Sequence, residues 1–173
     1  MAHVDTPLTI ASRRESRRYD QRQIPPDVER AILDAGRLAG SAKNRQPWRF
    51  VVVESPDIRE RLAETVFAPG NVRGARLIVA IVVSGKGPTS FDAGRAAQNM
   101  LLAAWDQGVG GSPNGMPERD AAAEILGVRE GESPAIVLTF GYPARKRDPL
   151  SWAVEEWSER ANRRPLEELV ERI

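Results

Sequence analysis

The sequence predicts a β-sheet covered by α-helices. Residues 77–83 and 135–141 are short apolar runs rich in β-branched side chains, as expected of buried strands. Between them, residues 90–107 carry small apolar side chains at helical spacing. Helices and strands alternate along the chain, which alone would favour a parallel sheet, but only three or four strands can be counted. The pattern therefore leaves the topology of the sheet open.

The first part of the chain is expected to contain two helices. Residues 6–12 are predicted to form a short helix that turns Leu8 and Ile10 toward the core. A second helix begins at Pro26, because proline is favoured in a first helical turn, and it ends before Gly40. Its expected apolar face, which follows the helical period, consists of Val28, Ala31, Ile32, Ala35, Leu38 and Ala39.

The remaining elements are separated by proline and glycine. A strand is expected at residues 49–54, and a third helix follows Pro56 and stops before Pro69. After the long helix we expect an irregular glycine-rich turn at 108–115, a helix at 118–126, the strand at 135–141 and a last short helix at 166–172. The long helix presents an alanine-rich face that allows close packing against another helix, formed by Ala93, Ala96, Ala97, Met100, Leu101 and Ala104.

Composition limits the classes of function. The 173 residues are 41% apolar and carry a net charge of +1, so we expect no general attraction to nucleic acid or to an anionic membrane. There is no cysteine and one histidine, His3, which argues against disulfides, thiolate catalysis and a metal site. The N-terminus lacks the apolar core of a signal peptide, and no apolar run is long enough to span a bilayer. We therefore expect a cytoplasmic protein without a nucleic-acid or membrane partner.

Two basic segments are candidate binding sites. Arg13, Arg14 and Arg17 form a cluster whose planar guanidinium groups match a phosphate. Arg163 and Arg164 form a second basic point near the end of the chain. Either segment alone is more typical of a solvated surface.

Two further segments have the composition of a ligand site. Residues 40–50 combine small side chains with two amides, Asn44 and Gln46, which can donate to and accept from the edge of a heterocycle. Residues 108–116 contain four glycines, which allow backbone N–H groups to approach a ligand closely. Taken alone, the first is an ordinary polar turn and the second an ordinary helix end with a loop.

Taken in chain order, from about residue 10 to the end, these segments resemble the FMN-dependent nitroreductase family. The resemblance starts with Arg-Arg-Glu-Ser-Arg-Arg-Tyr at residues 13–19 and continues with Gly-Ser-Ala-Lys-Asn-Arg-Gln-Pro-Trp at 40–48. It includes the helix Asp-Ala-Gly-Arg-Ala-Ala-Gln-Asn-Met-Leu-Leu-Ala-Ala at 92–104, followed by Gly-Val-Gly. Gly-Tyr-Pro at 141–143 and Arg-Arg-Pro-Leu-Glu-Glu at 163–168 complete it. Each motif is weak alone, but their shared order is specific.

The resemblance implies an α+β protein with a three-layer α/β/α fold and a mixed, mainly antiparallel sheet, in which residues 1–173 form one FMN-binding domain. It implies an intertwined homodimer with FMN at the interface, and an alanine-rich helix face packed in the dimer core. The implied activity is hydride transfer from NADH or NADPH to FMN, followed by two-electron reduction of a nitroaromatic, a quinone or a similar small acceptor. The cofactor carries this chemistry, so no side chain is expected to act as a catalytic acid or base.

The resemblance also implies which residues bind the cofactor. Arg13, Arg14, Arg17 and Arg163 would hold the phosphate and the polar edge of the flavin. Ser41, Ala42 and Asn44 would reach the same FMN from the partner subunit. Ser112, Pro113, Asn114 and Gly115 would lie along the isoalloxazine, with the backbone N–H of Asn114 or Gly115 near N5. Glu15, Gln46 and Gln98 complete the implied set.

Two departures from the family pattern matter. Glu15 replaces the family's serine, and we expect this carboxylate to face away from the phosphate or to accept from the flavin or its ribityl chain. The chain is also short between Ser84 and Asp92 and around Met116, which leaves no room for a helical lid and predicts an open acceptor pocket.

Two alternatives remain. A specialised flavin-dependent dehydrogenase or flavin-cleaving enzyme would share the same motifs. A non-enzymatic protein could instead use the arginine cluster to bind a phosphorylated partner or nucleic acid.

Overall fold

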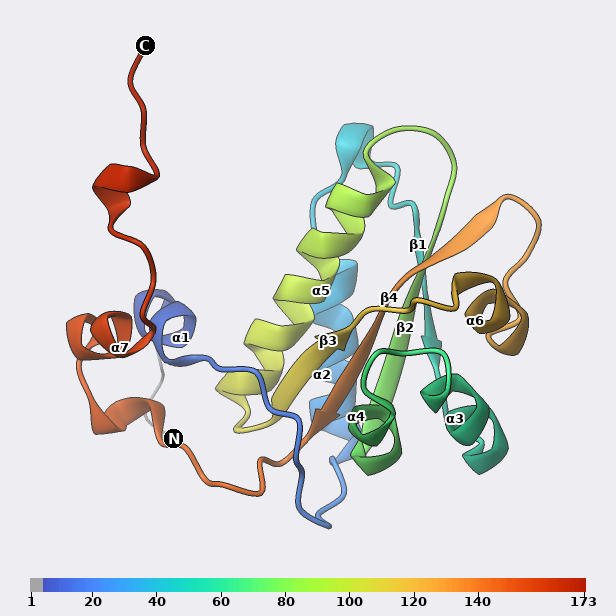
Figure 1. Ribbon diagram of the computed structural model, residues 1–173, viewed down its shortest axis with the longest axis horizontal. Coiled ribbons are helices and arrows are strands. Elements are labelled where there is room, and N and C mark those ends of the chain that lie inside the picture. The colour runs from blue at the N-terminus through green and yellow to red at the C-terminus, as the bar shows by residue number, and fades with distance from the viewer. Residues whose placement is uncertain (1–4) are drawn as a thin grey trace. The chain divides into compact units, whose positions relative to one another are not determined.

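The computed structural model describes residues 5–173. His3 lies outside the described residues. Residues 15–146 form one compact unit, and residues 5–14 and 147–173 together form a second, smaller one. The larger unit contains the sheet and the helices that cover it (Figure 1).

The sheet has four strands in the order β1-β2-β4-β3. β1 (Trp48–Val52), β2 (Leu77–Ser84), β4 (Glu132–Gly141) and β3 (Gly110–Asn114) pair with their neighbours in antiparallel register. The mainly antiparallel sheet implied by the resemblance is confirmed. β1 and β3 are the two edge strands of the sheet.

Helices cover both faces of the sheet. α2 (Pro26–Arg37) and α5 (Thr89–Asp106) pack on one face, and α3 (Pro56–Ala63), α4 (Pro69–Gly74) and α6 (Arg119–Ile125) lie on the other (Figure 1). Alternate residues of β2 divide between the two cores, since side chains along a strand point to opposite faces. Leu77, Val79, Ile81 and Val83 join the first core, and Ile78 and Ala80 join the second. The three-layer arrangement is confirmed.

The alanine-rich face of α5 is buried within its own chain. Ala93, Ala96, Ala97, Met100, Leu101 and Ala104 all belong to the core shared with α2 and the sheet. A Cβ atom on Gly36 of α2 would overlap the Met100 side chain, so the two helices are in close contact. The expectation that this face packs in a dimer core is therefore wrong, because its side chains have no surface left for a second copy.

The glycine-rich segment after α5 is a strand and not an irregular turn. Gly108, at φ +72°, ends the helix, as a residue without a side chain readily does. A Cβ atom on Gly110 would overlap the side chain of Ser16, and one on Gly111 would crowd Phe140. These glycines let neighbouring segments pack directly on the backbone of β3, a requirement that composition alone does not reveal.

Several smaller expectations were also wrong. Ile10 is 59% exposed, and Leu8 and Ile10 are two positions apart on a helix, so they cannot share one face. Ala31 and Leu38 are likewise exposed. The helix α4 was not predicted, and the helix expected at 166–172 is only the 3₁₀ turn Leu166–Glu168.

The smaller unit joins both ends of the chain. α1 (Thr6–Ser12) is capped by Asp5, whose carboxylate accepts from the backbone N–H of Leu8 at 2.8 Å. α7 (Val154–Arg160) buries Trp157, whose indole N–H donates to Pro149 O at 2.9 Å, in the 3₁₀ turn Pro149–Ser151. The Trp152 and Trp157 rings meet edge to face with centroids 4.5 Å apart. This aromatic cluster forms the centre of the unit.

Candidate functional site

The end of β3 is built around the buried side chain of Asn114, which is 4% exposed. Its Nδ2 atom lies 3.1 Å from Ser112 O, 3.2 Å from Val137 O and 3.1 Å from Thr139 Oγ1. These acceptors lie on β3 itself and on the adjacent β4. The amide therefore secures the strand and is not available to a ligand.

Tyr19 extends this network across β4. Its hydroxyl donates to Ser16 O at 2.5 Å and lies 3.0 Å from Thr139 O and 3.1 Å from Thr139 Oγ1. Burial is the largest influence on the pKa of Tyr19 and raises it, so the phenol stays neutral at physiological pH. Glu15 also raises this pKa, whereas the charge of Arg17 lowers it. The hydrogen-bonded network of Tyr19, Thr139, Ser112 and Asn114 that supports β3 therefore carries no charge.

A second segment holds the end of β3 from the side of α4. Asn71, 8% exposed, donates through Nδ2 to Asn114 Oδ1 at 2.8 Å. The backbone N–H of Phe67 donates to Gly115 O at 3.2 Å. The Phe67 ring is 79% exposed and lies directly beside Gly115. Two successive residues of the predicted flavin strand are therefore held by one short segment.

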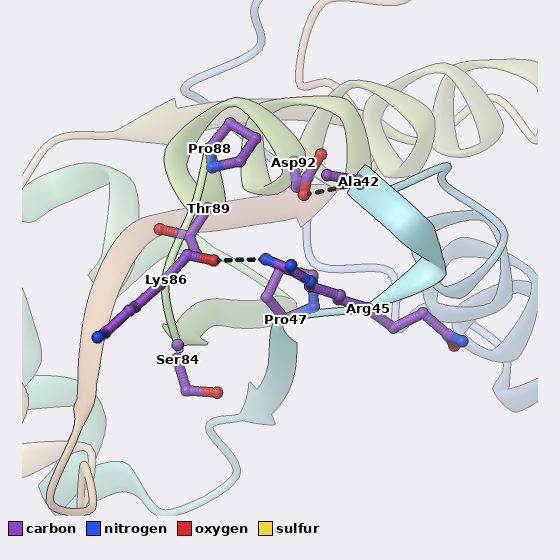
Figure 2. Close-up of a pocket in the computed structure, with 10 residues that line it drawn as sticks. Ala42, Arg45, Pro47, Ser84, Lys86, Pro88, Thr89 and Asp92 are labelled. Atoms are coloured by element: carbon purple, nitrogen blue, oxygen red, sulfur yellow. Dashed lines mark hydrogen bonds between the residues drawn. The ribbon is translucent and has the colours of Figure 1, made fainter.

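The other predicted group lies on the loop that leads into β1. The loop contains the 3₁₀ turn Ala42–Asn44 and borders a pocket of about 490 Å³ at the start of α5 (Figure 2). Asp92, 2% exposed, lies at this pocket and accepts from the backbone N–H of Ala42 at 3.3 Å. Arg45 donates from Nη1 to Lys86 O at 3.1 Å across it. The pocket is lined by Ala42, Arg45, Gln46, Pro47, Ser84, Gly85, Lys86, Pro88, Thr89 and Asp92.

The loop has an unusual backbone. Lys43, Asn44 and Gln46 have φ angles of 55°, 54° and 49°, in the left-handed region that non-glycine residues seldom occupy. The Ser41 hydroxyl accepts from the backbone N–H of Gln46 at 2.8 Å and closes the loop. Such conformations persist where the surrounding structure imposes them, and they are common at binding sites.

Arg14, in the smaller unit, is bonded to three backbone carbonyls. Nη1 donates to Ala11 O at 2.5 Å and to Arg13 O at 2.9 Å, and Nη2 donates to Trp157 O at 2.9 Å. The guanidinium also lies 5.4 Å from the centre of the Trp157 ring. These contacts join the end of α1 to α7, so Arg14 has a structural role in this unit.

Arg14 belongs to a group of four arginines in the smaller unit, with Arg13, Arg147 and Arg163. Burial lowers the pKa of Arg14 most, and the positive charges of Arg147, Arg163 and Arg13 lower it further. The structure thus brings together three predicted phosphate ligands, Arg13, Arg14 and Arg163, within the smaller unit. Arg147 was missed, although it ends the basic run Arg145-Lys146-Arg147.

Most of the predicted residues of the larger unit fall into two groups on opposite edges of the sheet. Residues 112–115 end β3, whereas residues 41–46 precede β1, and β2 and β4 lie between these strands. Glu15 and Arg17 lie outside both groups, in the segment that leads to Tyr19 at the start of this unit. Gln98 is exposed on α5. Phe67, Asn71 and Asp92 were not predicted as site residues, because their roles arise from contacts with residues distant in the chain.

Within residues 5–173, no cluster of histidine, cysteine, aspartate and glutamate side chains has the arrangement of a metal site. No helix in this part of the chain is long and apolar enough to cross a membrane.

The model of the Nitroreductase family matches residues 10–82 and 88–142 of this chain. The chain belongs to the nitroreductase family. The match includes both the loop before β1 and the end of β3, and the resemblance proposed from the motifs is confirmed.

Relatives extend the nitroreductase match beyond the family model. An Archaeoglobus fulgidus protein, provisionally named an NADH dehydrogenase/NAD(P)H nitroreductase, is 34% identical over 150 residues, or 80% of this chain and 86% of its own. A Desulfovibrio desulfuricans protein, provisionally named a nitroreductase and solved in complex with FMN, is 30% identical, with a TM-score of 0.78 and 96% of both chains covered. A nitroreductase family protein of Clostridium difficile 630 shares the fold, with a TM-score of 0.82 at 21% identity over 97% of this chain and 98% of its own.

Proposed function

We propose that this nitroreductase-family protein binds FMN and oxidises NADH or NADPH to reduce a small oxidised acceptor. The observation that carries the proposal is the D. desulfuricans relative, which was solved with FMN and matches 96% of both chains at 30% identity. The A. fulgidus relative, whose provisional name includes NAD(P)H nitroreductase, supports the nicotinamide donor.

The arginine group of the smaller unit has the chemistry that a flavin phosphate requires. The charges of Arg147, Arg163 and Arg13 repel that of Arg14 and lower its pKa, and a phosphate dianion would offset this repulsion. Both terminal nitrogens of Arg14 donate to backbone carbonyls, so we propose that Arg14 holds this group in place, and that Arg13, Arg147 and Arg163 add the positive charge that attracts the phosphate.

The end of β3 fits the flat ring of a flavin through its backbone. The Asn114 amide is bonded within the chain, so the group it can present is the backbone N–H of Asn114 or Gly115. A rigid N–H donor on a strand needs little reorganisation when a ligand binds. The neutral network of Tyr19 and Thr139 beneath it places no competing charge at this position.

We further propose that the protein acts as a homodimer in which the loop at residues 41–46 reaches the FMN of the partner. The two predicted groups of residues, 41–46 and 112–115, adjoin opposite edge strands of one sheet. They can bind the same FMN if one group comes from a second copy of the chain. Phe91 of α5 (67%) and Leu38 at the end of α2 (65%) are exposed apolar side chains that a second copy could cover.

When bound, FMN would supply the hydride-accepting ring and the two-electron transfer to the acceptor. The protein's residues bind and orient it, and none is assigned as an acid or base. Residues 85–88 join β2 directly to α5 without a further helix, which supports an open pocket for a planar acceptor such as a nitroaromatic or a quinone.

The test is the visible spectrum of the purified protein, before and after addition of FMN, followed by anaerobic titration with NADH and NADPH. We expect a yellow protein that bleaches with a nicotinamide donor and regains its colour with a quinone. A protein that stays colourless with added FMN would contradict the proposal. FMN that is retained but not bleached by either donor would favour the specialised flavin enzyme.

A further inference from the structure

We propose that Asn71 is a positioning residue that fixes the Asn114–Gly115 peptide beside the flavin. This inference rests on the proposed function, because it assumes that this peptide faces the cofactor. Asn71 was not among the residues that the motifs indicated, and it acts through Asn114.

Asn71 and Phe67 form hydrogen bonds on either side of one peptide group. Asn71 Nδ2 holds the side chain of Asn114 at 2.8 Å, on one side of the peptide that joins Asn114 to Gly115. The backbone N–H of Phe67 holds the carbonyl of Gly115 at 3.2 Å, on the other side. The N–H of Gly115 lies between these two hydrogen bonds, and together they fix the direction in which it points.

The donor from Asn71 determines how the Asn114 amide is oriented. Nδ2 of Asn114 faces Ser112 O, Val137 O and Thr139 Oγ1, which leaves Oδ1 to accept from Asn71. Without that donor, a buried acceptor would lose its partner, and the amide could turn and release the strand. A misplacement on the order of 1 Å at a reacting centre can cost about 100-fold in rate.

The helix that carries Asn71 is itself held in place. Arg73 of α4 forms ion pairs with Glu60 of α3 and with Glu64, which follows the last residue of α3, and Pro69 begins the helix at a fixed φ angle. Asn71 therefore projects from a braced element and not from a free loop.

The test compares Asn71→Leu and Asn71→Asp with the wild type. For each protein we would measure the dissociation constant of FMN and the rate at which a saturating nicotinamide donor bleaches bound FMN. For Asn71→Leu we expect the bleaching rate to fall about tenfold, with FMN affinity changed less than about threefold. A variant that only loosened the fold would lose FMN affinity instead.

Asn71→Asp gives a readout that a purely structural role would not produce. The introduced carboxyl can donate to Asn114 Oδ1 only when protonated, so its bleaching rate relative to wild type should rise as the pH falls through the pKa of that carboxyl. Tyr19 is the ionisable group in the same network and stays neutral in this range. On α4, Arg73 is paired with Glu60 of α3 and with Glu64 just after it, and α3 also carries Asp57, Arg59 and Arg61. This near-isosteric variant also keeps the test valid if Asn71→Leu does not fold.

Asn99→Leu is the matched control. Asn99 of α5 donates through Nδ2 to Ala35 O at 3.2 Å, on the opposite face of the sheet, and we expect its bleaching rate to match the wild type. Equal losses in this control, or wild-type rates in both Asn71 variants at every pH, would overturn the inference alone. A wild type that does not bind FMN would overturn the proposed function and this inference with it.

Discussion

Asn114 and Asn44 were assigned by sequence to the same cofactor, yet the structure holds them in opposite ways. Asn114 is 4% exposed, and both atoms of its amide are bonded within the chain. Asn44 is exposed and has a φ angle of 54° in the loop before β1. An asparagine whose amide is satisfied internally can offer a ligand only its backbone, whereas an exposed one can offer its side chain.

The same contrast extends to the edges of the sheet that carry the two residues. The β3 edge is secured by the neutral network of Tyr19, Ser112 and Thr139. The β1 edge is secured by an ion pair, in which Arg49 Nη2 lies 2.5 Å from Glu132 Oε2. The two predicted halves of the site should therefore respond differently to mutation and to pH.

The largest effect is expected for Asn114→Ala. Removing the amide leaves Val137 O and the Nδ2 of Asn71 without this partner in a buried position, which should lower the free energy of unfolding by about 2 to 3 kcal/mol. Urea denaturation followed by circular dichroism measures the change. A loss below about 1 kcal/mol would show that the β3 network is not important for stability.

Acid should weaken the β1 edge through Glu132. Hydrogen bonds from Arg49 and then from the backbone of Arg129 lower the pKa of Glu132 from 4.5 to about 2. Because the folded pKa is the lower one, the ion pair stabilises the protein fully above pH 4.5 and loses this contribution as the pH falls toward 2. The difference in unfolding free energy between wild type and Glu132→Gln should therefore be constant above pH 4.5 and shrink below it. A difference that stays the same down to pH 2 would contradict this assignment.

The smallest effect on stability is expected for Asn44→Gly. Glycine adopts a positive φ without strain but gains freedom in the unfolded chain, so the free energy of unfolding should change by less than about 1 kcal/mol. FMN affinity should nevertheless fall, because in the proposed dimer the exposed amide of Asn44 contacts the partner's FMN. Fluorescence titration with FMN measures this. Unchanged affinity would remove Asn44 from the proposed site while leaving the assignment of β3 intact.

Much of the fold followed from local patterns. The apolar run of β2 predicted a strand covered on both faces, and Pro26 and Gly40 marked the extent of α2 closely, because each signal depends on residues adjacent in the chain. β3 was misread because its glycines serve contacts with Ser16 and Phe140, which lie far away in sequence. Asn71 was missed for the same reason, since its partner is 43 residues away.

The sequence by itself determined the family, the positions of most helices and strands and the residue types available to bind a phosphate and a flat ring. These depend on local periodicity and on the order of motifs along the chain. Only the tertiary structure decided that the alanine-rich face of α5 is used within one chain, that the Asn114 amide faces inward and that the two predicted binding segments adjoin opposite edge strands. Burial and hydrogen-bond partners are properties of residues brought together from distant parts of the chain, and no local pattern specifies them.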